Sequence, residues 1–459
     1  MFPIVRNHQV RGTREIPRVV HRRRVESIPL PSVAAASVLA ACDGKTTVAD
    51  IALRFGVSSE GVSAFLAKLS DAGVVEFSEE AQEVPVSMSL GAQEPWLSEV
   101  HFDVTDRCNL AKHCPHCYRG DTLNQKSDHS LSDWKQVIDS LVAMGTCRIT
   151  ISGGEPFMRK DLHDIVEYAT ARGLLISAIF TNGTLDPGKS DRVLKFLADR
   201  QVGTSLYVSL DGPTAKTNDR YRGKGSFAKT TRFIEHVRNC YQGSSLSVSI
   251  NSQVNVYNVD RLLHWYDALK TLGIVRWRMN AGRLAGRLAI NSSLVVGRER
   301  LGAAYRSLIE RHLSDWKSGA APFDLNIEGF FRTRMLREGR AYTFSDELPI
   351  CDYKKHACSI DPSGEVRFCT SWTSRSFGNV FEDGIGPIWY GSDLQQLKRM
   401  QIGEVAECRG CELLRFCGGG CRLVANDLSS RDPISCERYR LFAENILPIF
   451  EREGIQFVV

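Results

Sequence analysis

Three cysteines lie within ten residues in the stretch DVTDRCNLAKHCPHCY, residues 103–118. The stretch follows an expected β-strand at residues 99–104, so Cys108, Cys114 and Cys117 share one loop. A four-iron cluster takes four ligands, and three cysteines therefore leave one iron open to a small molecule. The stretch predicts an iron–sulfur site with an open position.

A structural zinc ion is the alternative for this loop. Zinc would need a fourth protein ligand, and His113 or His116 could supply it. The order of strands and helices around the loop favours the iron–sulfur hypothesis.

Strands and helices alternate from residue 97 to residue 310. Helices are expected between the strands, for example at residues 132–144 and 160–172. Short turns between such βα units indicate a parallel barrel or partial barrel, in which chemistry takes place at the carboxyl ends of the strands. The cysteine loop follows the first of these strands. The six expected strands are residues 99–104, 148–152, 175–181, 203–210, 246–254 and 275–279.

Length and composition are those of a soluble globular protein with two or three domains. The chain has 459 residues, of which 43% are hydrophobic and 24% charged. The net charge of +5 does not by itself indicate nucleic-acid binding. The N-terminus has no apolar stretch of signal-peptide length, and the longest apolar-rich run, residues 33–42, is about half a membrane span. We therefore expect a cytoplasmic protein that does not contact a membrane.

Most of the 14 cysteines are grouped. In a reducing compartment, grouped cysteines indicate metal ligands rather than disulfides. Eight of them lie in residues 350–459, a turn-rich region with little periodicity, and such regions are usually held together by metal. Three cysteines stand apart, and each is expected to be a small buried apolar residue: Cys42, Cys147 and Cys240.

Further motifs follow the barrel strands in order. GGEP at residues 153–156 follows the second strand, and its glycines let the backbone approach a ligand. TNG at 181–183 ends the third strand, SLDG at 209–212 ends the fourth, and RG follows at 222–223. Together with the cysteine loop, these motifs resemble the radical S-adenosylmethionine (SAM) enzymes. The family usually has three residues between its first two cysteines, whereas this chain has five.

This resemblance implies cofactors and ligands. A cluster on Cys108, Cys114 and Cys117 would donate an electron to SAM, and the resulting 5′-deoxyadenosyl radical would remove a hydrogen atom from the substrate. A carboxylate at Glu155 could pair with the ammonium of SAM, and His116 stands where many members have an aromatic residue near the adenine. The residues expected to bind SAM are Gly153, Gly154, Glu155, Asn182, Ser209 and Arg222, with Asn255 a weaker candidate.

Several of these residues have simpler alternatives. Ser209 and Arg222 could be a turn residue and a surface cation. Cys147 or Cys240 could donate a hydrogen atom, as a peptide epimerase needs, although burial is the simpler expectation. The sequence identifies no catalytic acid or base.

The eight C-terminal cysteines resemble those of the SPASM domain, an extension found in many peptide-modifying radical SAM enzymes. Residues 408–421 have the spacing C-x2-C-x5-C-x3-C, and residues 364–369 read G-x4-C. The resemblance implies two fully ligated auxiliary clusters, hence three [4Fe–4S] clusters in all, whereas a zinc-ribbon-like site is the alternative. The implied ligands are Cys351, Cys358, Cys369 and Cys421 for auxiliary cluster I, and Cys408, Cys411, Cys417 and Cys436 for auxiliary cluster II.

Residues 1–90 are expected to form a small winged-helix-like α+β domain. Strands are expected at residues 18–20, 24–30 and 74–77 and a helix at residues 58–72, with an irregular linker at residues 79–95. The domain resembles the recognition element of ribosomal-peptide pathways, which is similar to the peptide chaperone of pyrroloquinoline quinone synthesis.

The resemblance of this domain implies that a leader peptide adds a strand to the exposed edge at residues 24–30, beside the helix at 58–72. Four cations could meet an acidic leader: Arg22, Arg23, Arg24 and Lys68. A DNA-binding winged helix is the alternative, but the helix is poor in Lys and Arg.

The expected fold is therefore α/β, with a recognition element at residues 1–90, a partial (β/α)6 TIM-like radical SAM barrel at 97–310, a bridging segment at 311–349 and a SPASM domain at 350–459. The expected activity is oxidation of a ribosomally made precursor peptide to install a thioether or carbon–carbon crosslink, with flavodoxin or ferredoxin as electron donor. Alternatives are a peptide epimerase, a protein-directed radical SAM maturase and, more remotely, a zinc-stabilised DNA-binding regulator.

Overall fold

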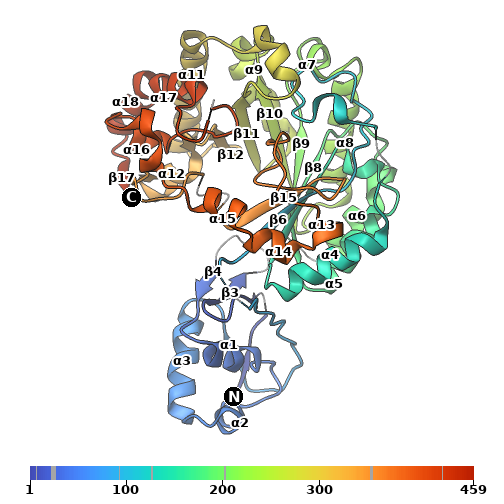
Figure 1. The fold of residues 1–459 in the computed structure, drawn as a ribbon, viewed down its shortest axis with the longest axis vertical. Helices are drawn as coiled ribbons and strands as arrows, with labels where there is room; N and C mark the ends of the chain where they lie inside the picture. The colour runs from blue at the N-terminus through green and yellow to red at the C-terminus, as the bar shows by residue number, and fades with distance from the viewer. Residues whose placement is uncertain are drawn as a thin grey trace.

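A small N-terminal domain, a central barrel and a C-terminal region that lies along one side of the barrel make up the computed structural model (Figure 1). No helix in the described part of the chain combines the length and apolar character needed to cross a bilayer. The structure describes residues 1–6, 8–21, 27–92, 94–125, 128–200, 203–351, 355–425 and 427–458.

Parallel strands in chain order form the barrel, as expected. Each strand from β6 to β11 pairs in parallel with the next one. Parallel neighbours require a crossover connection, and helices supply it here. The strands are β6 (Glu99–Asp103), β7 (Arg148–Ser152), β8 (Leu175–Thr181), β9 (Thr204–Ser209), β10 (Leu246–Val254) and β11 (Arg276–Ala281).

The crossover helices cover the outer face of the sheet. In α4 the side chains of Trp134, Ile138 and Leu141 form a fully buried stripe, and Ser130 caps the helix by accepting a hydrogen bond from the Asp133 amide. The main helices of this layer are α4 (Leu131–Ala143), α5 (Leu162–Ala171), α6 (Gly188–Asp199), α7 (Ala215–Arg222), α8 (Ser226–Cys240), α9 (Leu262–Leu269) and α11 (Arg298–Lys317).

The inner, concave face of the sheet is polar. Along β9, Leu206 and Val208 are fully buried against the helices, whereas Ser205, Tyr207 and Ser209 alternate with them and are only half-buried. Side chains alternate between the two faces of a strand, so these polar residues face the inside of the barrel. The barrel therefore has a polar inner face.

Two further segments extend the sheet at both of its edges. Beside β11 lies the parallel strand β12 (Asp324–Ile327), followed by the antiparallel β13 (Phe331–Arg332). Beside β6 lies the parallel strand β15 (Ala357–Ile360), followed by the antiparallel β16 (Val366–Arg367). The described residues thus form a ten-stranded sheet.

These strands change the expected bridging role of the segment 311–349. The boundary at residue 310 falls inside α11, and the segment 311–349 contributes β12 and β13 to the barrel rather than only bridging two domains. That segment also holds α12 (Thr333–Glu338) and β14 (Arg340–Tyr342), which pairs with the C-terminal strand β17 (Gln456–Val458). Sequence patterns missed these strands because they are too short to show a period.

The C-terminal region is built from short helices between its cysteines. It ends in two helices that pack on α11, where Phe442 and Phe450 are buried in the common core. The helices are α13 (Val380–Asp383), α14 (Ile385–Tyr390), α15 (Ser392–Arg399), α16 (Leu414–Cys417), α17 (Pro433–Asn445) and α18 (Leu447–Arg452).

The N-terminal domain has a three-stranded antiparallel sheet, β2–β3–β4, and three helices. The strand expected at 18–20 is present as β3, and the strand expected at 24–30 is present as β4, although Arg22, Arg23 and Arg24 lie outside the described residues. Two strands, β1 and β2, were not expected. The elements are β1 (Phe2–Ile4), β2 (His8–Gly12), β3 (Pro17–His21), β4 (Ser27–Pro29), α1 (Val33–Ala40), α2 (Val48–Phe55), α3 (Ser59–Asp71) and β5 (Glu76–Ser78).

The two edges of this small sheet differ. The expected irregular linker instead runs along β2, where the Val10 amide donates to the Ser87 carbonyl (2.9 Å) and the Gly91 amide to the Gly12 carbonyl (2.9 Å). Strand β4 has a strand partner on one side only within the described residues. Within the described residues, the open edge of this three-stranded sheet is therefore β4.

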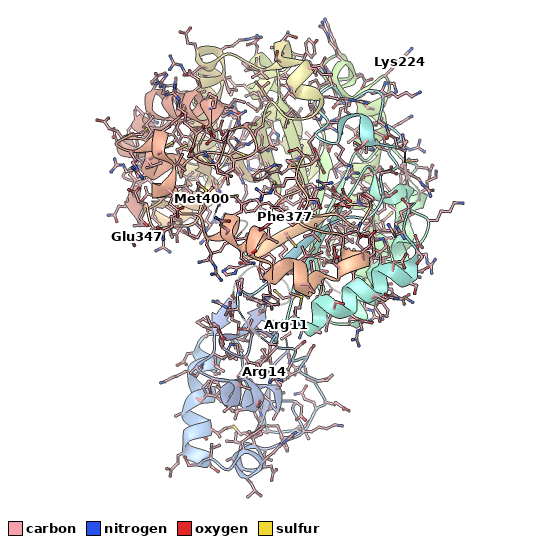
Figure 2. All side chains as sticks on the ribbon, viewed as in Figure 1. Arg11, Arg14, Lys224, Glu347, Phe377 and Met400 are labelled. Atoms are coloured by element: carbon pink, nitrogen blue, oxygen red, sulfur yellow. The ribbon has the colours of Figure 1, made fainter. Side chains whose placement is uncertain are left out.

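The N-terminal domain docks on the amino ends of the barrel strands, opposite to the cysteine loop. Arg11 is fully buried, and its guanidinium donates to the Gly173 carbonyl and to Ser87 Oγ, each at 3.0 Å (Figure 2). The Gly12 amide, at the end of β2, donates to the Gly145 carbonyl at 3.4 Å. Gly145 and Gly173 precede β7 and β8, so these contacts attach the domain to the barrel at the amino ends of its strands.

The three isolated cysteines lie far from the carboxyl ends of the strands. Cys147 is fully buried just before β7, under the N-terminal domain, and its thiol donates to the Ser98 carbonyl. Cys42 is buried in the N-terminal domain, as expected. Cys240, in contrast to the expectation, is exposed at the end of α8 on the outer helical layer. Neither Cys147 nor Cys240 is placed to donate a hydrogen atom inside the barrel.

We predict that Arg11→Gln lowers the free energy of unfolding by about 1–3 kcal/mol, because the buried Gly173 carbonyl loses a charged donor. Urea denaturation of the anaerobic protein measures this loss. Arg14→Gln, a neighbouring surface change, serves as the matched control (Figure 2). Equal stability of the two variants would contradict the docking role of Arg11.

Candidate active site

The cysteine loop is joined to the GGEP motif by backbone contacts. The Gly154 amide donates to the Thr105 carbonyl and the Glu155 amide to the Arg107 carbonyl, both at 2.7 Å. A Cβ atom at Gly153 would lie 2.5 Å from the Thr105 carbonyl oxygen, and one at Gly154 would lie 2.2 Å from that of Arg107. The glycines therefore let the loop after β7 hold the backbone that leads into Cys108.

Asn124 fixes the first cysteine from the other side. Its side-chain oxygen accepts from the Cys108 amide (2.8 Å), and its side-chain nitrogen donates to the Cys108 carbonyl (3.1 Å). Asn124 itself has a left-handed backbone (φ 63°), which asparagine tolerates better than most residues. Nothing in the sequence motif indicated this residue, which lies beyond the third cysteine.

Glu155 is fully buried and bonds to the end of β8 rather than facing a ligand. Its carboxylate accepts from Thr181 Oγ1 (2.8 Å), from the Asn182 amide (2.7 Å) and from the Phe157 amide (3.3 Å). Burial raises the pKa of Glu155 to about 7, although these hydrogen bonds favour the charged form. The Glu155 side chain is therefore a brace between the loops after β7 and β8.

Asn182 continues this brace back to the cysteine loop. Its side-chain nitrogen donates to Asn109 Oδ1 (3.0 Å), and its side-chain oxygen accepts from the amide of Thr184 (2.8 Å). Asn109 in turn donates to Thr184 Oγ1 (2.7 Å). The residue directly after the first cysteine is thus tied to the end of the third strand, and Asn182 bonds to protein groups through both its side-chain nitrogen and its side-chain oxygen.

The enlarged segment between Cys108 and Cys114 is held from outside by the segment around α10 (Arg287–Ile290). The Arg287 guanidinium donates to the Ala111 carbonyl, and the Arg287 amide donates to the Cys117 carbonyl (3.0 Å). Asn291 donates to the Pro115 carbonyl (3.3 Å). The Ala111 contact lies inside the enlarged segment, and the contacts at Pro115 and Cys117 hold the chain directly after it.

The histidines beside the cysteines are engaged elsewhere. The His116 ring stacks on Tyr221 (centroids 4.4 Å apart, 3° between planes), and its Nε2 lies 3.4 Å from the Arg222 guanidinium. Burial and the neighbouring Arg222 lower the pKa of His116 well below its ordinary value. His113 packs against Gly223. These contacts disfavour either imidazole as a fourth zinc ligand.

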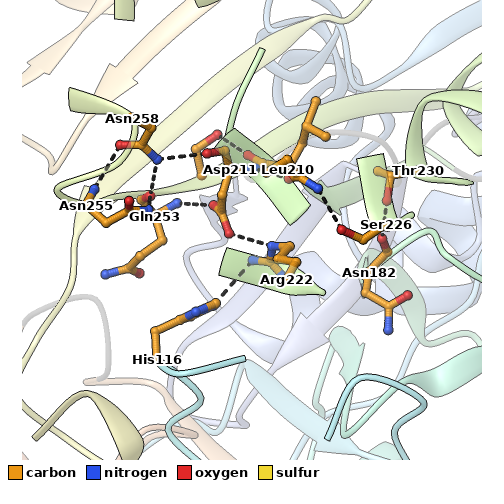
Figure 3. A network of polar contacts seen from close by, with 12 residues as sticks. His116, Asn182, Leu210, Asp211, Arg222, Ser226, Thr230, Gln253, Asn255 and Asn258 are labelled. Carbon is orange, nitrogen blue, oxygen red and sulfur yellow. Dashed lines mark hydrogen bonds and ion pairs between the residues drawn. The ribbon is translucent and has the colours of Figure 1, made fainter. Parts of the chain in front are cut away.

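Arg222 is part of a buried network at the carboxyl end of β9 (Figure 3). It forms an ion pair with the fully buried Asp211, whose other carboxylate oxygen accepts from the Gln253 amide (2.6 Å). Asn258 donates to the Asp211 carbonyl (2.9 Å) and accepts from the amide of Asn255 (2.9 Å). Arg222 is therefore buried and is not a surface cation. Asn255 forms hydrogen bonds within the turn that follows β10.

Ser209 differs from its neighbours because its hydroxyl has no hydrogen-bond partner among the described residues. It lies at the last position of β9, half-buried on the concave face. Of the residues expected to bind SAM, Ser209 and Arg222 thus line the barrel mouth, while Glu155 and Asn182 support the loops.

The three cysteines of the loop are largely buried thiols. Burial raises the pKa of Cys108 to about 12 and that of Cys114 to about 11, and Cys117 adds to both rises. Thiols of this kind become thiolates when a metal ion compensates the charge. The donor set of three thiols and no imidazole fits an iron–sulfur cluster with one open iron.

The C-terminal cysteines form at least one compact set. Burial raises the pKa of Cys417 to about 12, with further rises from Cys436, Cys408 and Cys411. Cys436 in turn raises the pKa of Cys408 after burial, so these four thiols are mutual neighbours. They are the four residues expected to share auxiliary cluster II.

The cysteines expected to share auxiliary cluster I come from separate elements. Cys358 lies fully buried on β15, and Cys369 follows β16 and packs against the same core. Cys421 is placed by its amide, which donates to Asp432 Oδ2 (2.9 Å). Cys351 precedes residues that lie outside the described part of the chain.

A parallel partial barrel with an incomplete cysteine set after its first strand defines an enzyme of the radical SAM type. The chain matches the radical SAM superfamily model over residues 102–252 and the SPASM model, an iron–sulfur cluster-binding domain, over residues 351–412. Mycofactocin maturase MftC of Mycolicibacterium smegmatis is 30% identical over 327 residues, which are 70% of this chain and 76% of the relative. This chain therefore belongs to the radical SAM superfamily and carries a SPASM region.

Other relatives differ in the activity that their names state. Fe-coproporphyrin III synthase of Methanosarcina barkeri is 29% identical over 344 residues, which are 71% of this chain and 83% of the relative. The crystal structure of Streptococcus suis SuiB bound to the precursor peptide SuiA superposes with a TM-score of 0.68 at 15% identity, covering 95% of this chain and 99% of SuiB. The fold shared with SuiB thus includes the N-terminal domain.

We predict a pH-dependent difference in stability between the wild type and Glu155→Gln. The folded-state pKa of Glu155 is raised from 4.5 to about 7, so the folded state binds this proton more tightly and its contribution to stability falls as pH rises. Between pH 5.5 and pH 8 the wild type should lose about 2 kcal/mol relative to the variant. Urea denaturation of the anaerobic proteins tests this, and parallel pH profiles would contradict the burial of an ionisable Glu155.

Proposed function

We propose that this enzyme modifies a ribosomally made precursor peptide by net oxidation, installing an intramolecular thioether or carbon–carbon crosslink. The single observation that supports this most strongly is the combination of a radical SAM site at one end of the barrel with a separate small domain whose sheet has an open edge at the other end. A small-molecule enzyme does not need the second feature.

The site residues divide into ligands and supports. Cys108, Cys114 and Cys117 would hold a [4Fe–4S] cluster, and Ser209 and Arg222 would contact SAM. When bound, the cluster and SAM supply a 5′-deoxyadenosyl radical that removes a hydrogen atom from the peptide. The backbone of residues 153–155 holds the loop at Cys108, and the buried ion pair with Asp211 keeps Arg222 oriented toward His116. These contacts would hold the cysteine loop and Arg222 in their positions before the cofactors bind.

The C-terminal cysteines support a net oxidation. Four of them are mutual neighbours and would hold auxiliary cluster II, while Cys351, Cys358, Cys369 and Cys421 would hold auxiliary cluster I. Two fully ligated clusters suit electron transfer, with a flavodoxin or ferredoxin as the external donor. Epimerisation needs a hydrogen-atom donor, and neither Cys147 nor Cys240 lies inside the barrel. Crosslinking is therefore the favoured reaction.

The leader peptide would bind at β4. The Leu30 amide donates to the Pro17 carbonyl (2.7 Å), so in this antiparallel pair Ile28 also faces β3, while the backbone of Ser27 faces outward. On α3, Phe65 is half-buried beside the domain core, as is Ile28 on β4. An added strand could pair with Ser27 and place an apolar side chain against this surface.

We predict that coexpression with the short peptides encoded beside this gene yields one peptide that has lost two hydrogen atoms per crosslink. Tandem mass spectrometry measures the loss and locates the joined residues. The triple variant Cys108→Ala/Cys114→Ala/Cys117→Ala, which retains the eight C-terminal cysteines, should leave the peptide unchanged. An unchanged mass with an inverted stereocentre would instead establish epimerisation, and activity on a tetrapyrrole but on no peptide would overturn the proposal.

We predict that Ser27→Pro weakens binding of the precursor peptide about tenfold, because it removes one outward amide from the open edge. Ser27→Ala keeps that amide and is the matched control. Fluorescence anisotropy of the labelled precursor measures affinity, while peptide-independent SAM cleavage should be equal in both variants. Equal affinities would show that the leader does not pair with β4.

A further inference from the structure

A row of polar side chains crosses the concave face of the barrel sheet on strands β9 to β13. Ser209 is paired in register with Asn251, Asn251 with Arg278, Arg278 with Asn326, and Asn326 with Arg332. Residues that are partners across neighbouring strands point to the same face of a sheet. The five side chains therefore form one continuous row.

This row faces the interior of the barrel rather than the helical layer. Trp277 and Met279 flank Arg278 on β11 and are fully buried in the core under the helices. Phe331, which precedes Arg332, is also fully buried in that core. Because side chains alternate along a strand, Arg278 and Arg332 point to the opposite, concave side.

Two arginines of the row have no carboxylate partner among the described residues, namely Arg278 and Arg332. The other guanidiniums of this wall are paired: Arg276 donates to Tyr207 Oη (3.2 Å) and lies 3.7 Å from Asp324. Arg438 forms an ion pair of 3.0 Å with Glu328.

The acidic side chain of Glu328, just after β12, bonds to other groups. Glu328 accepts from Arg438 through Oε2, and through Oε1 from the Ala281 amide (2.6 Å) and Tyr305 Oη (3.1 Å). Both carboxylate oxygens are thus occupied. The wall formed by β11, β12 and β13 therefore carries a net positive charge toward the barrel interior.

The pKa of Arg332 reflects the cluster of positive charges around it. Burial and the neighbouring charges of Arg278, Arg334 and Arg276 lower the pKa of Arg332 from its ordinary value. Like charges held side by side are unfavourable unless an anion compensates them. Asn251, between Ser209 and Arg278, has a buried side-chain oxygen without a hydrogen-bond partner. Within the described residues, the row thus has a side-chain oxygen without a donor at Asn251 and two guanidiniums without a carboxylate partner at Arg278 and Arg332.

We infer that Arg278 and Arg332 bind a carboxylate of the substrate inside the barrel. A guanidinium binds a carboxylate with two parallel hydrogen bonds, which fixes orientation as well as charge. The row begins at Ser209, at the proposed SAM site, so a substrate anchored at Arg278 would lie next to the site of hydrogen abstraction. The inference rests on the proposed function in that the substrate is a peptide, whose carboxylate is either an Asp or Glu side chain or the C-terminus.

The test measures binding of trifluoroacetate by 19F NMR to the anaerobically reconstituted full-length enzyme saturated with SAM. The double variant Arg278→Gln/Arg332→Gln should weaken this binding about tenfold or more. Arg306→Gln, which changes an exposed arginine paired with Glu310 on α11, is the matched control and should bind as the wild type does. Trifluoroethanol, which is uncharged, should bind none of the proteins specifically.

Competition distinguishes the two sources of the carboxylate. N-acetylglutamate α-amide presents only a side-chain carboxylate, and N-acetylleucine presents only a terminal one. Displacement of trifluoroacetate by the first assigns the site to an acidic residue of the peptide, and displacement by the second assigns it to the C-terminus. Failure of both to displace the probe would overturn the inference.

Two further results would also overturn it. One is unchanged affinity for trifluoroacetate in the double variant, and the other is loss of the wild-type signal when SAM is added, which would assign the arginines to the carboxylate of SAM. Iron content and cluster absorbance verify folding, and Arg278→Gln alone provides the test if the double variant does not assemble. This assay needs no precursor peptide, so its outcome is independent of the crosslinking experiment.

Discussion

The close contact between two backbone segments, residues 105–107 and 153–155, is the constraint on which the active site depends. The two hydrogen bonds between them can form only because Gly153 and Gly154 have no side chains. The contact sets the path of the chain into Cys108, and Glu155 extends it to β8. A buried carboxylate that binds three donors is better suited to holding loops than to binding a ligand. The motif after the second strand thus holds the cysteine loop and the end of β8 in place. Its effect on the cofactors would follow from this positioning.

The barrel places the N-terminal domain and the cysteine loop at opposite ends. The N-terminal domain contacts Gly145 and Gly173 at the amino ends of the strands, whereas the cysteine loop lies at the carboxyl ends. A peptide that bound at β4, as proposed, would have to extend along the molecule before its reactive part entered the barrel. On the concave face, the row from Ser209 to Arg332 presents polar side chains. The opposite face of the same strands is apolar and packs against the helices. Two binding surfaces at opposite ends would select both the leader and the reactive segment of a substrate.

The sequence predicted the features that are local or repeated. All six barrel strands were expected within two residues of their observed bounds, because alternating βα units leave a clear period. The short strands β12 and β15 were missed, since only pairing across the sheet makes them strands. Asn124 and Arg287 were missed for a similar reason: each acts on a cysteine-loop carbonyl from a distant or unpatterned segment. The contacts of Glu155 with the end of β8 could not be predicted either, because burial and hydrogen-bond donors cannot be derived from a motif alone. The row at Arg278 could not be predicted, because it depends on which residues pair across neighbouring strands.

We propose that only the set of Cys108, Cys114 and Cys117 leaves an iron open to SAM, while the C-terminal sets are complete. Electron–nuclear double resonance with SAM carrying 15N at its amino group tests where SAM binds. We expect a nitrogen coupling in the reduced wild type that is lost when the three loop cysteines are changed to alanine and retained when the four cysteines of auxiliary cluster II are changed. A coupling that survives loss of Cys108, Cys114 and Cys117 would contradict it.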